Sequence, residues 1–303
     1  TERGMTMEHL TGISVSERRQ SILKNVKHAQ STVIECETAS ISGVVSQRAC
    51  VYCGARVVLN PVTDAAHIVH GPIGCAAYTW DIRGSLSSGA ELYRNSFSTD
   101  LRETDIIFGG EKKLASAIAS IIAEKHPRTV FVYSTCVVGV IGDDVEAICK
   151  KASIDYSIPV LPVNSTGFAG TKKDGYKAAC TTLLRLMDLA APSAFKKSKA
   201  QEGAAPSINF LGDFNLAAEA WIIKGYLQEI CISVRTCLTG DATVSSIQDA
   251  IYADLNIVQC AGSMTFLAKQ MKQRYGIPFI SVRFLGLHDT AQSLRNIVSL
   301  FGD

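Results

Sequence analysis

Residues 48–84 read RACVYCGARVVLNPVTDAAHIVHGPIGCAAYTWDIRG, and this stretch carries three cysteines and two histidines. Cys75 closes the segment HGPIGC, where two glycines free the backbone and Pro72 stiffens it. Upstream, Cys50 and Cys53 form a C-x-x-C pair. Because glycines have no side chain, they let a bulky inorganic group approach the main chain. We therefore interpret this stretch as one side of a metal site.

Cys136, in the segment STCVVGVIGDD, extends this candidate site. Iron–sulfur clusters are held by thiolates, usually four, and Cys50, Cys75 and Cys136 all lie in glycine-bearing loops or at predicted strand ends. Two alternatives stay open. Free cysteines often pack as small buried residues, and the C-x-x-C pair also suits a redox couple or, more weakly, zinc. His67 and His70 are predicted on a short helix, each as a core residue.

Composition and charge restrict the classes of function. With 303 residues, 47% of them hydrophobic and 19% charged, the chain is a globular protein of two domains. A net charge of +2 gives no electrostatic case for nucleic acid or an anionic membrane as a partner. The sequence contains no apolar run of membrane-spanning length and no secretory signal core. Ten cysteines without an export signal favour a reducing cytoplasm.

The first half of the chain predicts an arm and then an α/β domain. Residues 1–47 form an N-terminal helical arm, whose helix is capped by Ser16. Residues 48–195 form the first α/β domain, in which strands and helices alternate as they do in a parallel sheet covered on both faces. The predicted strands are 105–110, 129–135 and 158–166, and the predicted helices are 111–126, 141–153 and 174–188.

A linker at about 191–206 separates this domain from a second alternating set, which we assign to a domain at 206–303. Four strands and four helices in this set predict tandem Rossmann-like parallel-sheet domains. Cys136, Cys237 and Cys260 fall at the carboxyl ends of predicted strands, the edge where open α/β sheets bind ligands. The second set comprises strands 207–213, 232–238, 255–260 and 278–284 and helices 217–230, 243–251, 264–275 and 289–301.

Several motifs together resemble a known family. They include HGPIGCAAYTWDIRG, FGGEKKL, STCVVGVIGDD, GFAGTKKDGYKAA, GDFN, LTGDAT, SMTFLAKQMKQRYGIPF and GLHDTAQSLRNI. In this order and spacing they are similar to the α-type subunits of the nitrogenase component 1 superfamily, and most of all to its branch of cofactor-assembly scaffolds. The resemblance runs from about Arg48 to the end of the chain.

The resemblance implies a ligand set and partners. Cysteines in the positions of Cys50, Cys75 and Cys136 ligate a [4Fe–4S] cluster at the interface with a homologous β-type subunit, whose thiolate completes the shell. Such scaffolds form α2β2 assemblies, receive electrons from an ATP-dependent reductase iron protein, and hold an iron–sulfur precursor of the iron–molybdenum cofactor between their domains.

Three further positions separate assembly from catalysis. In a catalytic α subunit, a glutamine, a histidine and an arginine line the reacting face of the cofactor. Here Lys173 and Tyr176 stand in place of the glutamine and the histidine, and Arg83 retains the arginine. Tyrosine relays protons poorly at neutral pH because its pKa is about 10. We therefore favour a scaffold over the alternatives, a catalytic nitrogenase or tetrapyrrole-type reductase subunit and a plain binding module.

Lys172 and Lys173 have two readings, of which the first is a role in such a scaffold. Ammonium groups at a helix N-terminus add to the positive end of the helix dipole and attract an anionic precursor. The alternative is a pair of solvent-facing lysines at the start of a helix.

Cys237 is the candidate anchor of the precursor, but it departs from the family pattern. The scaffold cysteine belongs at Thr236, and this chain has cysteine and threonine exchanged. A one-residue shift in a strand points a side chain to the other face. The family also has a third α/β domain beyond the position where this sequence stops, so the precursor pocket is expected to be open on one side. With the pocket open on one side, we expect that the isolated chain can be without metal.

Overall fold

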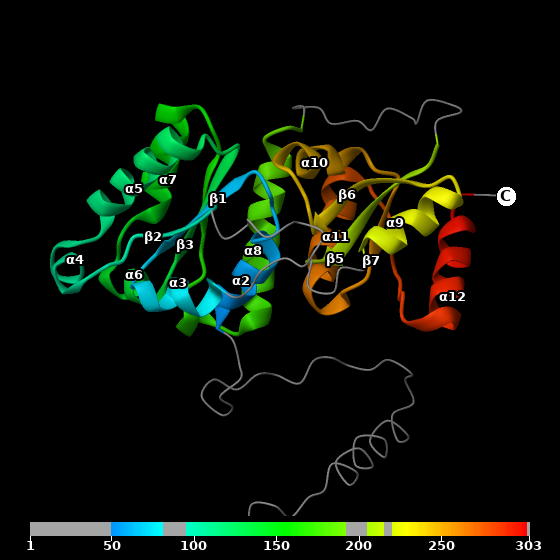
Figure 1. The fold of residues 1–303 in the computed structure, drawn as a ribbon, viewed down its shortest axis with the longest axis horizontal. Helices are drawn as coiled ribbons and strands as arrows, with labels where there is room; N and C mark the ends of the chain where they lie inside the picture. The colour runs from blue at the N-terminus through cyan, green and yellow to red at the C-terminus, as the bar shows by residue number, and fades with distance from the viewer. Residues whose placement is uncertain (1–49, 81–94, 192–204, 215–219, 302–303) are drawn as a thin grey trace, which may run out of the picture. The chain divides into compact units, whose positions relative to one another are not determined.

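The computed structural model describes residues 50–80, 95–191, 205–214 and 220–301 (Figure 1). The expected helical arm over residues 1–47, with its Ser16 cap, lies outside these ranges. So do Arg83 and most of the predicted linker.

The first sheet has the strand order β2-β1-β3-β4, and all its pairs are parallel. Alternate residues of the central strand β3 enter different cores. Phe131 and Tyr133 pack toward α2 and α8, whereas Val130 and Val132 pack toward α5 and α7. A strand covered on both faces has no polar side to its sequence. The elements are β1 (Ala65–His70), β2 (Ser96–Ser98), β3 (Thr129–Ser134), β4 (Val160–Val163), α2 (Val51–Leu59), α5 (Glu111–Lys125), α7 (Val145–Tyr156) and α8 (Lys172–Asp188).

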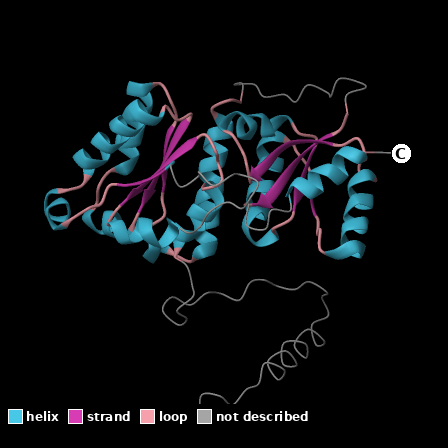
Figure 2. Cartoon of the chain, viewed as in Figure 1, coloured by secondary structure: helices cyan, strands magenta, loops and turns pink. Residues whose placement is uncertain are grey.

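The second sheet has the order β6-β5-β7-β8, again all parallel. It confirms the four strands and four helices predicted for this half, with helices on both faces (Figure 2). Helices α9 and α12 share one core with β5 and β6, and α10 and α11 pack on the opposite face. The bounds are β5 (Ser207–Asp213), β6 (Ser233–Thr239), β7 (Leu255–Val258), β8 (Phe279–Ser281), α9 (Ala220–Glu229), α10 (Val244–Asp249), α11 (Ala261–Tyr275) and α12 (Gly286–Val298).

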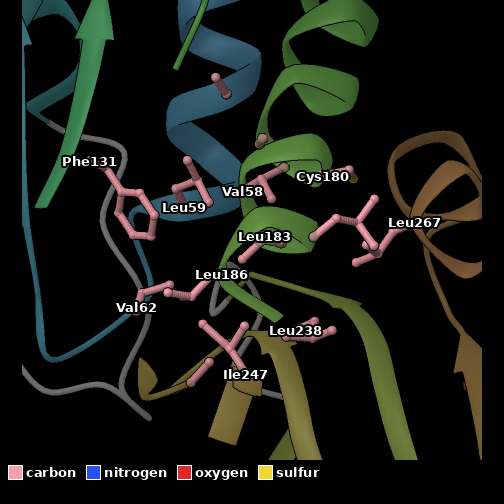
Figure 3. Packing of buried hydrophobic residues seen from close by; sticks show 14 of the residues in the cluster. Val58, Leu59, Val62, Phe131, Cys180, Leu183, Leu186, Leu238, Ile247 and Leu267 are labelled. Atoms are coloured by element: carbon pink, nitrogen blue, oxygen red, sulfur yellow. The ribbon is translucent and has the colours of Figure 1, made fainter. Parts of the chain in front are cut away.

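One hydrophobic cluster joins the two sheets across helix α8 (Figure 3). Leu183 and Leu186 of α8 lie between side chains of the first half, such as Val58, and side chains of the second half, such as Leu238 and Ile247. Hydrogen bonds connect the same regions: the Thr239 hydroxyl donates to the Val58 carbonyl, and the Val244 N–H donates to the Asp64 carboxylate at 2.9 Å. Both sheets fall within one compact unit, Ser40–Asp303, so the boundaries at 195 and 206 remain predictions.

Helices α2 and α8 touch backbone to backbone through two glycines. A Cβ on Gly54 would overlap the Lys172 carbonyl oxygen, and a Cβ on Gly175 would overlap the Val51 carbonyl oxygen and lie 2.7 Å from the Ala55 nitrogen. Only glycine permits this approach. The contact brings the first turn of α2 against the first turns of α8.

The prediction of a buried strand at 105–110 is wrong. These residues belong to α4 (Glu103–Phe108) and to the turn after it, and Phe108 is 85% exposed. A short apolar run is compatible with either a strand or a helix, so local hydrogen bonds decide which of the two forms here. The Asp105 carboxylate accepts the Arg102 N–H at 2.9 Å and thereby closes the first helical turn. Gly109, with φ of 87°, ends the helix.

The helix predicted around the two histidines is also wrong, because they lie on the inner strand β1, next to β3, and are fully buried. His67 Nδ1 lies 2.9 Å from the Tyr133 hydroxyl. His70 Nε2 lies 3.0 Å from the Asp143 carboxylate, which also accepts the Gly110 N–H at 3.0 Å. His70 is hydrogen-bonded at both ring nitrogens, since Nδ1 lies 3.0 Å from the Thr99 hydroxyl, and it is the satisfied core histidine that its sequence context predicts. His67 is buried as predicted, but its Nε2 has no hydrogen-bond partner in the described part of the chain. Burial lowers the pKa of each imidazole, and at His70 the Asp143 carboxylate acts in the opposite direction.

We predict that Gly175→Ala destabilises the chain by about 3 kcal/mol, because the added methyl group must separate α2 from α8. The matched control is Gly225→Ala in α9, where a Cβ would meet no atom within 4 Å. The control should be neutral or stabilising by up to about 1 kcal/mol. Urea denaturation of the 303-residue chain measures both. Equal midpoints for the two variants would contradict the glycine contact.

We also predict that stability falls as the pH is lowered below about 6.5. Burial, with a smaller contribution from the Arg56 charge, holds the folded pKa of His67 well below its ordinary value of 6.5. Below that pH the unfolded chain therefore binds a proton that the folded chain does not bind. The free energy of unfolding should fall by up to about 1.4 kcal/mol from this residue at pH about 5.5.

The pH dependence of urea midpoints tests this assignment. His67→Gln should lower stability at neutral pH but flatten its fall in acid, whereas His288→Gln on the surface should leave the wild-type slope unchanged. An unchanged slope in the His67 variant would assign the acid sensitivity to other groups.

Candidate metal centre

The three predicted ligands lie at the starts of three helices, at the carboxyl edge of the first sheet. Cys50 is the N-cap of α2, Cys75 lies in the first turn of α3 (Ile73–Trp80), and Cys136 begins α6 (Cys136–Ile141) directly after β3. The sequence produces this arrangement because β1 and β3 are parallel neighbours, so the chain leaves both at the same edge. Helix N-termini favour the anionic form of a thiol.

Gly167 lies between two of the sulfurs. Its N–H donates to Cys136 Sγ at 3.2 Å, and a Cβ at this position would lie 2.8 Å from Cys136 Sγ and 3.5 Å from Cys50 Sγ. The residue belongs to the 3-10 turn η4 (Gly167–Ala169), which precedes α8. Gly167 had no predicted role, and the two glycines of GFAG, which permit a tight turn, are the signal that could have pointed to it.

Cys75 lies at the same edge of the sheet, in the first turn of α3 after β1. Burial is the main cause that raises its pKa, and the nearby Cys136 and Cys50 thiols raise it further through charge repulsion. Within the described residues, no three His, Cys, Asp or Glu side chains could hold a single metal ion. Cys50 and Cys136 are soft thiol donors beside a glycine that leaves room at their sulfurs, and this donor chemistry fits an iron–sulfur cluster.

A fourth thiol lies behind the first. Cys53 Sγ is 3.8 Å from Cys50 Sγ, and the Cys53 side chain is only 1% exposed. The hydrogen bond between the two sulfurs is the main cause that lowers the pKa of Cys50 to about 6. The same contact, together with burial, raises the pKa of Cys53. The sequence placed the two in one motif, but only the structure shows that the sulfurs touch.

The cysteine group faces solvent and is flanked by apolar side chains. Cys136 is exposed, and Cys50 and Cys75 are half-buried. The flanking side chains are 58% to 76% exposed and project from the elements that carry the cysteines and Gly167. We call them the apolar rim, which consists of Ile73, Tyr78, Val140 and Phe168.

The predicted precursor contacts on α8 lie at its N-terminus. Lys172, Lys173 and Tyr176 are half-buried, and Lys172 Nζ lies 5.9 Å from the centre of the Tyr176 ring. Thr171 begins the helix: its N–H and hydroxyl donate to the Asp174 carboxylate at 2.8 and 2.9 Å. Because η4 leads directly into α8, these side chains follow Gly167 closely along the chain.

The structure does not bring Cys237 to this group. Cys237 lies within β6 and is 3% exposed, packed in the core that contains Phe210 and Ile223. Burial is the main cause that raises its pKa to about 12. Thr236 points elsewhere, and its hydroxyl lies 3.2 Å from the Ser246 hydroxyl. Thr236 and Cys237 therefore point to opposite faces of β6, as predicted for neighbours in a strand. The anchoring role of Cys237 stays a prediction.

None of the helices in the described ranges has the length and apolar character to cross a membrane.

Comparison with known proteins identifies relatives of the chain. A family model described as "Nitrogenase component 1 type Oxidoreductase" matches residues 50–303. The "Nitrogenase iron-molybdenum cofactor biosynthesis protein NifE" of Clostridium pasteurianum is 58% identical over 292 residues, which cover 95% of this chain and 62% of the relative. The protein of the same name from Methanosarcina barkeri is 50% identical over 291 residues, or 95% of this chain and 63% of the relative. The chain thus spans less than two thirds of the length of these relatives.

Solved structures agree with this result. "Nitrogenase Cp1 at pH 6.5" matches with a TM-score of 0.77 and 37% identity, over 88% of this chain and 51% of that chain. The same protein at pH 5 matches with a TM-score of 0.76 and 36% identity, over 88% and 54% of the two chains. These similarities confirm the expected fold class. From Cys50 to its last residue, the chain belongs to the nitrogenase component 1 type oxidoreductase family.

Proposed function

We propose that the chain is a scaffold subunit for assembly of the nitrogenase iron–molybdenum cofactor. The observation that carries the proposal is that Cys50 and Cys136 meet at Gly167, with Cys75 in a helix start at the same edge of the sheet, in a chain whose relatives are named for biosynthesis of this cofactor. In this role the protein binds and orients clusters, and the clusters carry the chemistry. The expected location is the cytoplasm.

Cys50, Cys75 and Cys136 would hold a [4Fe–4S] cluster, which supplies one-electron transfer when bound. Three thiolates from this chain leave one iron for a ligand from elsewhere. The Gly167 N–H, which donates to Cys136 Sγ at 3.2 Å, would also donate to that sulfur in the bound state. Hydrogen bonds to ligand sulfurs tune the reduction potential of a cluster, so Gly167 both makes room for the cluster and tunes it.

The fourth thiolate would come from a homologous, NifN-like β-type subunit in an α2β2 assembly. The apolar rim supports this proposal, because four large exposed apolar side chains on or beside the elements that carry one exposed thiol, Cys136, and the half-buried Cys75 form a surface that another chain would desolvate. An ATP-dependent reductase iron protein would supply electrons to the assembly.

A larger iron–sulfur precursor would bind near the start of α8. Lys172 and Lys173 place cationic groups at the positive end of the helix dipole, which favours an anionic cluster. Tyr176 would line the same region, and Arg83 would join it from the segment outside the described residues. Lys173 and Tyr176 support assembly over dinitrogen reduction, because they stand in place of the glutamine and the histidine of a catalytic subunit.

Loss of Cys75 should remove the interface cluster. We expect Cys75→Ala, purified without oxygen together with the β-type partner, to lose most of the cluster iron and its visible absorption. The matched control is Cys149→Ala, because Cys149 is buried in α7 away from the rim. Full iron content in the Cys75 variant would refute the ligand assignment.

A separate assay tests the alternative of a catalytic subunit. Robust acetylene reduction by the wild-type complex with the iron protein would favour that alternative.

The Gly167 backbone should be needed as much as the thiols. We expect Gly167→Ala to lower cluster occupancy or shift its reduction potential, because the new methyl group would press on Cys136 Sγ. Gly74→Ala is a matched control next to Cys75, since a Cβ there meets no atom within 4 Å. Iron analysis and potentiometric titration of the complex provide the readouts. Wild-type occupancy and potential in the Gly167 variant would remove this residue from the site.

A further inference from the structure

Cys50 and Cys53 occupy the first turn of α2 as its N-cap and third helical residue. Their sulfurs are 3.8 Å apart, and the Gly54 N–H donates to the Cys50 carbonyl at 3.2 Å, which closes the turn between them. A disulfide requires sulfurs about 2.05 Å apart and Cβ atoms about 3.8 Å apart. The remaining gap closes by rotation of the two side chains together with a shift of Cys50, which as the N-cap has extended backbone angles and lies outside the helix.

The two thiols differ in access. Cys50 is half-buried and lies on the open side with Cys136, whereas Cys53 is 1% exposed and lies behind it. An oxidant in solution therefore reaches Cys50 first. Because Cys53 is closed to solvent and contacts the Cys50 sulfur, it can react only with a mixed disulfide that has formed at Cys50.

We propose that Cys50 and Cys53 form a reversible disulfide when no cluster is bound, and that a low-molecular-weight disulfide such as oxidised glutathione is the oxidant. The Cys50 thiolate attacks one sulfur of the oxidant, forms a mixed disulfide and releases one thiolate. The Cys53 sulfur then attacks Cys50 Sγ and displaces the second thiolate. The two cysteine protons go to the two released thiolates, so two cysteines are oxidised and one small disulfide is reduced.

The disulfide has a consequence that rests on the proposed function. Cys50 cannot bond to iron and to Cys53 at the same time, because a cluster ligand must be a free thiolate. Oxidation would therefore keep a cluster-free chain from loading, and a thiol reductant would release it. Formation of the bond itself needs no metal and no partner, so it is tested separately.

The 303-residue chain, freed of iron with a chelator under argon, is incubated with oxidised glutathione. Free thiols are then alkylated and the chain is digested with trypsin. Both cysteines fall in one peptide, ACVYCGAR at residues 49–56. We expect this peptide to lose two hydrogens, to carry no alkyl group, and to regain both thiols after treatment with dithiothreitol.

Two variants separate the steps. Cys53→Ser should leave Cys50 as a stable mixed disulfide with glutathione, because the displacing sulfur is gone. Cys50→Ser should leave Cys53 unmodified, because oxidant cannot reach it. Two results would overturn the proposal: a wild-type peptide 49–56 that keeps both thiols, or one linked to residues 129–150, which contain Cys136.

A second measurement tests the consequence. The oxidised chain is offered iron and sulfide together with the β-type partner, before and after dithiothreitol. We expect several-fold less iron bound before reduction than after it, whereas Cys53→Ser treated with dithiothreitol should load as the wild type does. If the disulfide forms but loading is unchanged, Cys50 is not a ligand and the proposed function fails while the disulfide stands. If the disulfide does not form but iron loads, the disulfide proposal fails while the proposed function stands.

Discussion

The backbone contact between α2 and α8 at Gly54 and Gly175 determines how the rest of the described structure is arranged. Two helices meet this closely only where neither carries a side chain, and the approach sets the first turn of α2 against the start of α8. Cys50 begins one of these helices, and Gly167 lies in the turn that leads into the other. The geometry of the thiol group therefore depends on helix packing as much as on the loops that hold the cysteines. The same α8 carries the core that joins both sheets, so the site and the main hydrophobic cluster share one support.

A parallel sheet explains why the thiols gather where they do. Strands β1 and β3 are neighbours, so the chain leaves both at one edge, and a new helix begins there each time. Each helix start offers N–H groups and a positive dipole end, which suit thiolates and sulfide. The edge is also where the chain is most open, and the exposed apolar rim lies on these same short helices. Reactive sulfur, positive backbone dipoles and apolar surface thus come together because of topology, in segments separated along the chain.

The Cys50 and Cys53 thiols connect this site to the interior. A ligand thiol must stay accessible to iron, and Cys50 is half-buried. Its neighbour Cys53 is enclosed by α2 and α8, where a free cysteine packs as a small hydrophobic residue. The contact of 3.8 Å between their sulfurs places a packing residue in position to react with a ligand. A cluster and a disulfide are then two ways to use the same Cys50 sulfur, and the redox state of the surroundings selects between them.

The sequence by itself determined the features that local pattern encodes. Long periodic segments such as α5, α8 and α11 and apolar strands such as β3 and β5 form as predicted, because their side-chain spacing is a local property. The motifs around Cys50, Cys75 and Cys136 identified the family without coordinates. The tertiary structure decided what depends on distant neighbours. β1 is a strand because it lies between two parallel strands, although AAHIVH lacks alternation, and α4 is a helix because Asp105 caps it. The position of Gly167 between two sulfurs, and of Cys237 in a core, arises from contacts between residues far apart in sequence, which no local pattern records.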